Sequence, residues 1–411
     1  MAKEKVKKEK HIKLRLIIFF LIVAILASTY FFVDKIEKFV NFAFNDNALP
    51  TTIEDSGLKV HFIDVDQAEA IFIEFPSGET MLIYSGDVSS SSQKKFVSYL
   101  DKLSYNEEDG EKVIDYFIIT HPHDDHIGGA VTVFENYKVK NCVRPNVKSQ
   151  NKKDKTLSEK VYGDEATCDN ETYNKIIHAL ANEVVSSGCT SITSDSHLKI
   201  KSKNFVSENL NNDANTWQLT FLSPNVDDLP YTKSGNFDYN NYSPIMILEY
   251  MNRKIMFTGD AEKPVEKNVI KLCEQNSMLS FLDVDILNAG HHGSKTSSSA
   301  EFLNYVKPEY VVISAGVKNQ FNHPHTETIN NLKNIGLSEN DIYCTNKNGN
   351  VLVGVSKTGK MSLISDYVQY TTFKIEWWYL FSTGTVIAAI VIFAPLLSKK
   401  YRKIVKKHLK N

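Results

Sequence analysis

The sequence lacks several features that would place it in common classes of protein. Its 411 residues include five cysteines, none in a CxxC pair, so a cysteine-based metal site is not indicated. It contains no repeat of roughly 20–50 residues, the length typical of solenoid and propeller folds. General electrostatic binding of nucleic acid requires an excess of basic residues, but residues 16–398 hold 33 Lys and Arg against 47 Asp and Glu. What remains is an ordinary globular composition, 42% hydrophobic, in a chain long enough to bury a large core.

Charge is almost absent from two hydrophobic runs near the ends of the sequence. Residues 14–33 carry one charge, at the edge of the run, and residues 379–398 carry none. Each run is long enough to cross the roughly 30 Å hydrocarbon core of a bilayer. The first also exceeds the apolar region of a cleaved signal peptide, about 7–15 residues. We therefore expect two transmembrane helices, 14–33 and 379–398, joined to the central domain by a stalk (34–57) and a juxtamembrane segment (366–378).

Basic tails, 1–13 and 399–411, flank these runs and set the expected topology. By the positive-inside rule both tails should be cytosolic, which predicts a two-pass protein of the cell membrane with an extracytoplasmic central domain. The tails either bind anionic lipid headgroups or only fix the orientation. An extracytoplasmic domain permits disulfides, so Cys168 and Cys189 either form a pair or remain buried free thiols.

The most informative segment is His121-Pro122-His123-Asp124-Asp125-His126, followed by Ile127-Gly128-Gly129. It comes directly after the apolar run 116–120, which predicts a buried strand. Imidazole and carboxylate are the ligands of hydrolytic Zn and Mn sites. Because side chains alternate along an extended chain, His121 and His123 point the same way and can bind one ion. Asp125 and His126 can then face a second ion.

This pattern resembles the HxHxDH motif of the metallo-β-lactamase fold. Residues 256–262, with Asp260, resemble the motif whose aspartate bridges both ions. Residues 283–294 resemble the strand that ends in a ligating histidine. Their HHGS form, with the segments 308–316, 322–325 and 346–349, is similar to the hydrolase domain of ComEC-type competence proteins. The resemblance covers roughly 58–355 and implies an α/β fold, a four-layer αββα sandwich, which we place at 58–365.

Three departures from the family pattern bear on activity. Asp66-Gln67-Ala68-Glu69 stands where the family has Gly-Gln-Gly-Asp, and Tyr84 replaces an aspartate that supports the metal ligands. Asp87 is close enough in sequence to substitute for it. The stretch 240–243 contains no histidine, although many enzymes of this fold have one there. Loss of such supporting groups costs on the order of 10–100-fold in affinity or activity.

The resemblance implies two divalent ions, Zn or Mn, with the following ligands. One ion would be bound by His121, His123 and Asp260. The other would be bound by Asp125, His126, Asp260 and one of His291 and His292. The remaining histidine would hydrogen-bond the leaving oxygen, so the expected catalytic residues are Asp125, His291 and His292. Ser294, Lys295 and His323 are expected to hold the substrate. Two ions about 3.5–4 Å apart suit an in-line displacement at a phosphodiester.

These features predict a membrane-anchored, binuclear metal-dependent hydrolase that acts on a phosphodiester. The ComEC resemblance implies a nuclease-like role in DNA uptake, with single-stranded DNA as substrate. Two alternatives stay open. One is a hydrolase of cell-wall polymer or lipid phosphoesters such as phosphorylcholine, which the acidic charge of 16–398 favours. The other is a non-catalytic binding protein that retained the fold, which the changes at 66–69 and Tyr84 favour.

Overall fold

The computed structural model describes residues 17–24, 57–145, 170–194, 198–203, 205–207, 210–223, 239–317, 319–366 and Thr385. The chain divides into two compact units, one made of Leu49–Val368 and the other of Met1–Ala48 with Gln369–Asn411. All the predicted site residues belong to the unit Leu49–Val368, whose described strands run from Leu58 to Ser365.

The first layer of strands is a nine-stranded sheet in the order β16-β15-β1-β2-β3-β5-β6-β7, with β4 paired to β5. Neighbours from β16 to β3 are antiparallel, and those from β3 to β7 are parallel. The strands are β1 (Leu58–Phe62), β2 (Ile71–Glu74), β3 (Thr80–Ile83), β4 (Glu107–Glu108), β5 (Glu111–Ile118), β6 (Lys138–Arg144), β7 (Thr190–Thr193), β15 (Val351–Val355) and β16 (Met361–Ser365).

The second sheet has seven strands in the order β14-β13-β12-β11-β10-β9-β8. Its neighbours are antiparallel from β8 to β11 and parallel from β11 to β14. The strands are β8 (Lys199–Lys201), β9 (Gln218–Phe221), β10 (Met246–Tyr250), β11 (Arg253–Phe257), β12 (Ile286–Asn288), β13 (Tyr310–Ile313) and β14 (Ile342–Cys344). Each sheet thus has a parallel part, and the loops at the carboxyl ends of such strands commonly carry ligand sites.

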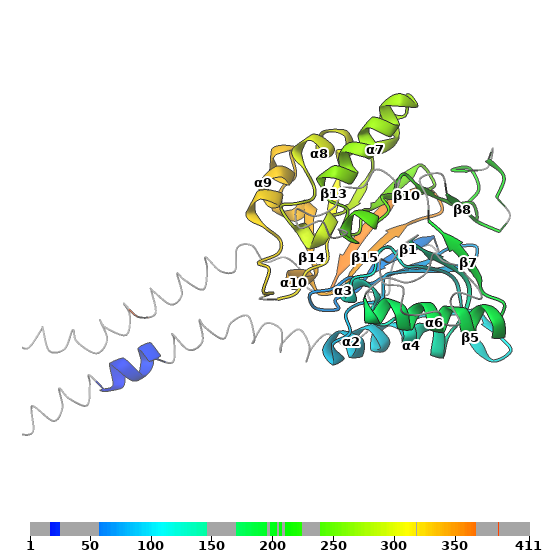
Figure 1. Ribbon diagram of the computed structural model, residues 1–411. Helices are drawn as coiled ribbons and strands as arrows, with labels where there is room; N and C mark the ends of the chain where they lie inside the picture. Colours follow the sequence, from blue (N-terminus) through cyan, green and yellow to red (C-terminus); the bar gives the residue numbers. More distant parts are fainter. Residues whose placement is uncertain are drawn as a thin grey trace, which may run out of the picture. The chain divides into compact units, whose positions relative to one another are not determined.

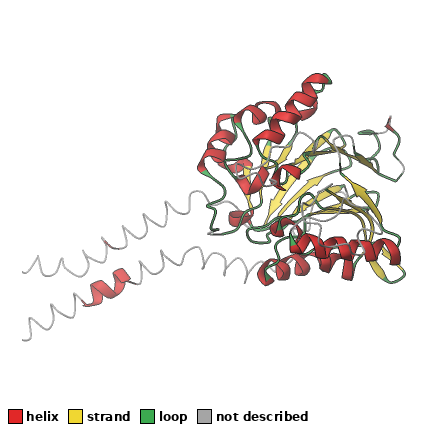
Figure 2. Cartoon of the chain, viewed as in Figure 1, coloured by secondary structure: helices red, strands yellow, loops and turns green. Residues whose placement is uncertain are grey.

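Helices cover the outer face of each sheet, and the two sheets face one another (Figures 1 and 2). The helices on the first sheet are α2 (Ser90–Leu100), α3 (Asp124–Ile127), α4 (Ala130–Asn136) and α6 (Glu171–Ser186). Those on the second are α7 (Lys263–Gln275), α8 (Ala300–Val306) and α9 (Thr326–Asn334), while α10 (Thr345–Asn348) follows β14. The shorter 3-10 helices are η4 (Tyr239–Tyr242), η5 (Leu279–Leu282), η6 (Gly290–Gly293) and η7 (Glu339–Asp341). The predicted four-layer αββα sandwich is confirmed.

The pattern of apolar residues explains these layers. In α6 the buried side chains recur at helical spacing, Tyr173, Ile176, Ile177, Leu180 and Ala181, and form one face against the first sheet. Asn170 caps this helix, because its side chain accepts a hydrogen bond from the backbone N–H of Tyr173. Between the sheets, alternate residues of β1 and β15 pack with Phe221 and Phe257 of the second sheet. Three apolar clusters therefore separate the four layers.

One prediction is wrong. The two-pass membrane localisation is contradicted, because no helix in the described part of the chain is long and apolar enough to cross a bilayer. The predicted spans 14–33 and 379–398 lie largely outside the described residues. Of these two spans the structure describes only a helix over 17–24 and the single residue Thr385.

The alternative of free thiols holds for Cys189, which is buried and free, as are Cys142, Cys273 and Cys344. Cys168 lies outside the described residues.

Candidate metal centre

The histidine-rich segment forms a loop at the carboxyl end of β5, as predicted. The loop begins with Thr120 and His121 and enters the short helix α3 after His123. Its two glycines allow a close approach to the neighbouring loop: a Cβ on Gly128 would lie 2.2 Å from the backbone of Asp87, and one on Gly129 would lie 2.5 Å from the carbonyl oxygen of Ser85. A side chain at either position would push the histidine loop away from the sheet.

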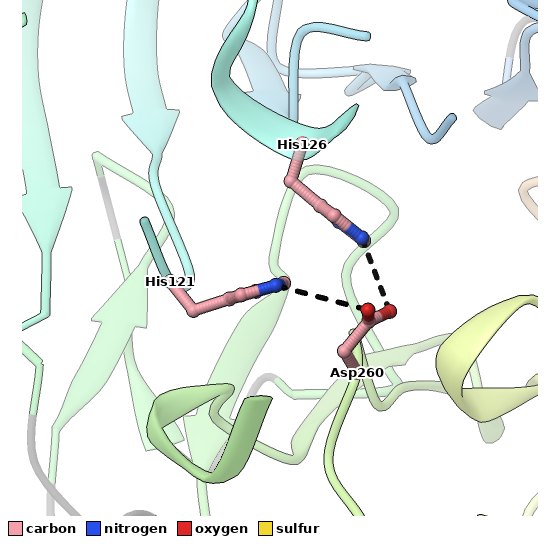
Figure 3. Close-up of side chains that lie close together, drawn as sticks. All are labelled: His121, His126 and Asp260. Atoms are coloured by element: carbon pink, nitrogen blue, oxygen red, sulfur yellow. Dashed lines mark ion pairs between the residues drawn. The ribbon is translucent and has the colours of Figure 1, made fainter. Parts of the chain in front are cut away.

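The first candidate metal group consists of His121, His126 and Asp260, all buried. Asp260 follows β11, so the second sheet brings it to the histidine loop. Its Oδ1 lies 3.1 Å from Nε2 of His126, and its Oδ2 lies 3.8 Å from Nε2 of His121. Figure 3 shows the three side chains pointing toward one another. This geometry brings together one carboxylate and two imidazoles from opposite sheets.

The second candidate group consists of Asp125, His126 and His292. Nε2 of His292 lies 3.2 Å from Oδ2 of Asp125 and 3.8 Å from Oδ1 of Asp260. The opposite nitrogen, Nδ1, lies 2.8 Å from the carbonyl oxygen of Ser314, which fixes the ring with Nε2 toward the group. His126 therefore belongs to both groups.

The structure gives the adjacent histidines 291 and 292 different surroundings. The sequence had left open which of the two is the metal ligand. His292 is buried within the second group, whereas the side chain of His291 is 22% exposed and lies outside both groups. Nδ1 of His291 lies 3.0 Å from the Thr296 hydroxyl, and its Nε2 lies 3.7 Å from Oδ2 of Asp260. Both histidines have left-handed backbones, φ 52° and 55°, a conformation that costs about 1–3 kcal/mol for each such residue and is concentrated at functional sites.

His123 lies outside both groups, which differs from the predicted pairing of His121 with His123. Its ring makes T-shaped contacts with His121 and Tyr239, with centroids 4.8 Å and 6.0 Å apart. The alternation argument assumed an extended loop. The chain instead turns into α3 after His123, and His126 rather than His123 meets Asp260.

Ser243, which sequence reasoning passed over as part of a stretch without histidine, supports the first group. Its hydroxyl lies 2.9 Å from Nδ1 of His121 and accepts a hydrogen bond from the backbone N–H of Asp260 at 3.0 Å. The Thr120 hydroxyl lies 3.1 Å from the same Nδ1. These contacts orient the His121 ring with Nε2 toward Asp260.

Asp87 does not support the metal ligands in the way the sequence suggested. Its carboxylate accepts a hydrogen bond from the backbone N–H of Ser89, at the start of α2. The buried Tyr84 ring packs edge-on against His126, with centroids 5.1 Å apart. Glu69, also buried, places Oε2 3.7 Å from Nδ1 of His126.

Burial and mutual charge shift the pKa values within the cluster. Burial alone would raise the pKa of Asp260, but the neighbouring imidazoles, His126 foremost, hold it well below its usual range. Burial lowers the pKa of His121 well below the ordinary value, and the charge of His126 adds to this effect. Burial would also lower the pKa of His292, but Asp260 and Asp125 raise it to about 10. Metal ions and protons compete for the same nitrogens, so metal affinity should depend on pH.

The three predicted substrate residues differ in their placement. His323 is buried beside the candidate centre, with its ring 5.6 Å from His291 and 6.2 Å from His292, and burial lowers its pKa to about 4. Lys295 is exposed, and its backbone N–H donates to Nδ1 of His325. Ser294 is buried, and its hydroxyl pairs with Thr296 rather than facing the cluster.

The residues present fit a divalent metal site. Four buried atoms of the cluster have no hydrogen-bond partner in the part of the chain that the structure describes: Nε2 of His121, Nδ1 and Nε2 of His126, and Oδ1 of Asp260. Buried polar atoms are nearly always hydrogen-bonded, so unpaired ones require an explanation such as a bound ion. Imidazole nitrogens with carboxylate oxygens form the donor set of Zn and related metals.

Comparison with known proteins places this domain. Residues 63–186 match the family model described as the metallo-beta-lactamase superfamily. ComE operon protein 3 of Bacillus subtilis (strain 168) is 26% identical over 302 residues, 71% of this chain and 32% of its own length. Recombination protein 2 of Haemophilus influenzae (strain ATCC 51907 / DSM 11121 / KW20 / Rd) is 28% identical over 278 residues, 67% of this chain and 26% of its own length. Competence protein ComA of Neisseria gonorrhoeae is 38% identical over 96 residues, 23% of this chain and 13% of its own length.

The chain spans at most about a third of the length of these curated relatives. The longest of these three matches, to ComE operon protein 3, extends over 302 residues. The sandwich and the histidine loop agree with these comparisons: residues 63–186 match the metallo-beta-lactamase superfamily model, and the chain is similar to proteins named for competence and recombination.

Proposed function

We propose that this protein is a metal-dependent hydrolase whose substrate is a phosphodiester. The observation that carries the proposal is the set of buried, unpaired ligand atoms on His121, His126 and Asp260. Leaving a buried polar group unpaired costs about 1–3 kcal/mol. A divalent cation accounts for Nε2 of His121, Nε2 of His126 and Oδ1 of Asp260 together, because it accepts electron pairs from imidazole and carboxylate alike.

The ligands of the two proposed ions follow from the two groups. One ion would be held by His121 and Asp260, and the other by Asp125 and His292, with Nε2 of His126 completing the ligands of one of them. When bound, the ions would supply Lewis acidity toward a phosphoryl oxygen. Asp260 lies within 3.8 Å of a ring nitrogen in each group, so its carboxylate is the candidate bridge between the ions.

The histidine outside the groups supplies the remaining chemistry. Thr296 holds the His291 ring at Nδ1, and Nε2 lies toward Asp260 from a partly exposed position. We assign His291 the donation of a proton to the leaving oxygen, a role that needs a positioned and accessible imidazole. His323, whose ring is 5.6 Å from that of His291, is the candidate contact to the substrate on this side.

A phosphodiester is favoured over other esters by the relatives, whose names refer to competence and recombination. The test is hydrolysis by the purified full chain, loaded with Zn or Mn, of bis(p-nitrophenyl) phosphate, single-stranded DNA and a phosphorylcholine ester. We expect hydrolysis of the aryl phosphodiester that EDTA abolishes and added metal restores. Absence of metal binding would support the non-catalytic alternative, and cleavage of the phosphorylcholine ester alone would support the wall or lipid alternative.

A further inference from the structure

We infer that Glu69 is a positioning residue that orients the His126 imidazole for metal binding, an inference that rests on the proposed function. His126 is the residue on which both groups depend. Its Nε2 lies 3.1 Å from Asp260, and its opposite nitrogen, Nδ1, lies 3.7 Å from Oε2 of Glu69. A neutral imidazole that binds a metal through one nitrogen carries a proton on the other, and that proton needs an acceptor.

The Glu69 carboxylate is held in place from both sheets. Glu69 is 3% exposed and lies in the loop between β1 and β2. Its Oε1 accepts a hydrogen bond from Nδ2 of Asn288, at the end of β12, at 2.8 Å. Its backbone N–H donates to the carbonyl of Asp125, and its backbone carbonyl accepts from Gly86. With Oε1 engaged, Oε2 is the oxygen left to face His126.

The other groups on this side of His126 do not supply the acceptor. The Tyr84 ring and the imidazole meet in a T-shaped contact, and the Asp87 carboxylate is hydrogen-bonded at the start of α2. Nδ1 of His126 has no hydrogen-bond partner among the described residues. Glu69 is the carboxylate within ion-pair distance of that nitrogen. A small closure of this gap when the ring binds an ion would complete the contact.

A purely structural role for Glu69 makes a different prediction. Through Asn288, Glu69 links the loop of one sheet to a strand of the other, and that link alone would affect only folding. Glu69→Gln keeps the size of the side chain and the acceptor for Asn288, but it replaces the oxygen that faces His126 with an amide donor. A positioning role for Glu69 therefore predicts that this variant loses metal affinity, whereas a purely structural role predicts little change in metal affinity.

The experiment measures zinc affinity by competition with a chromophoric chelator, alongside urea unfolding of the metal-free protein. For Glu69→Gln we expect affinity to fall by about 10–100-fold, the usual effect of losing a group that orients a ligand. The matched control is Glu79→Gln, a glutamate that is 1% exposed and accepts a hydrogen bond from Nε1 of Trp217. This control should lower stability and leave zinc affinity unchanged.

Zinc affinity equal to that of the wild type in folded Glu69→Gln would overturn the inference alone. A wild-type protein that binds no zinc would overturn the proposed function and the inference with it. Should Glu69→Gln fail to fold, proton NMR of the zinc-loaded wild type decides. We expect a slowly exchanging His126 Nδ1 proton, shifted downfield by a carboxylate acceptor, and a resonance at the position of an unbonded imidazole N–H would refute it.

Discussion

His61 and His126 are both buried, and they differ in what their ring nitrogens contact. His61, on β1, has Nδ1 2.9 Å from the Tyr99 hydroxyl and Nε2 2.9 Å from Glu74. Among the described residues neither ring nitrogen of His126 makes a hydrogen bond, and Nε2 has Asp260 as an ion-pair neighbour at 3.1 Å. A buried histidine with both nitrogens paired ties elements of the fold together, whereas one with both unpaired is poised to take a ligand. Burial alone does not separate the two kinds, but the count of satisfied hydrogen bonds does.

The largest effect is expected from Asp260→Asn, which removes the carboxylate that faces both groups. Metal affinity should fall by more than about 100-fold, because even groups that only support a ligand contribute about 10–100-fold. Metal content after dialysis and the rate on bis(p-nitrophenyl) phosphate measure this. The matched control is Asp124→Asn, because the Asp124 carboxylate in the same loop accepts a hydrogen bond from Asn170 instead. Full metal content in Asp260→Asn would remove Asp260 from the ligands.

The next effect separates the adjacent histidines. His292→Ala should lose metal from the second group, because its Nε2 faces Asp125 there. His291→Ala should retain both ions and lose rate, most severely on esters with poor leaving groups, because it would lack the proton donor. Metal content and a series of aryl phosphodiesters distinguish the two losses. The reverse pattern would exchange the two roles.

A smaller effect is expected from Ser243→Ala. The variant removes the hydroxyl that contacts both Nδ1 of His121 and the backbone N–H of Asp260. Affinity for the ion of the first group should fall by about tenfold, while the ion of the second group stays bound. Titration with zinc should then show two separated steps. A zinc titration curve identical to that of the wild type would leave Ser243 with no role in the site.

The smallest effect is expected at the paired histidine, as a dependence of stability on pH. Burial lowers the pKa of His61 despite its Glu74 partner. Burial would raise the pKa of Glu74, but the hydrogen bond from His61 and the charges of His61 and Lys59 lower it. Both groups therefore bind protons less readily when folded, so their contribution is complete above the unfolded histidine pKa of about 6.5 and is lost as the pH falls.

Urea unfolding at decreasing pH measures this loss, and Glu74→Gln should remove the part below the unfolded glutamate pKa. The expected size is about 1 kcal/mol, as for one hydrogen bond. Zinc affinity at neutral pH should stay that of the wild type. A change in zinc affinity would mean that the two histidine environments are coupled.

The fold and much of the candidate site could be predicted from the sequence because the patterns that indicate them are local. The strand before His121, the histidine loop and the turn with Asp260 each lie within a few consecutive residues, and the structure places them at the ends of β5 and β11. The membrane prediction rested on two long, almost uncharged hydrophobic runs and their basic flanks, and the described helices do not support it. The residue ranges of the domains and the roles of the site residues stay predictions.

The groups that sequence reasoning missed act across long separations in the chain. Ser243 contacts His121 at a separation of 122 residues, and Glu69 contacts Asn288 at 219. No local pattern encodes such pairs, because they exist only once the two sheets have packed. The only signal available for either residue was its position in a segment that departs from the family pattern.

The candidate centre draws its side chains from loops of both sheets, and this has a consequence for the energetics of folding. Asp125 and His292 are 167 residues apart in sequence, so an ion that joins them closes a very long chain loop, as a cross-link would. Each half of the domain alone offers an incomplete set of donors, so only the packed sandwich would bind the proposed ion tightly. A ligand specific for the native state adds RT ln(1 + [L]/Kd), about 2.7 kcal/mol at a hundredfold excess over Kd. The supply of metal would therefore raise or lower the free energy of unfolding of the packed sandwich.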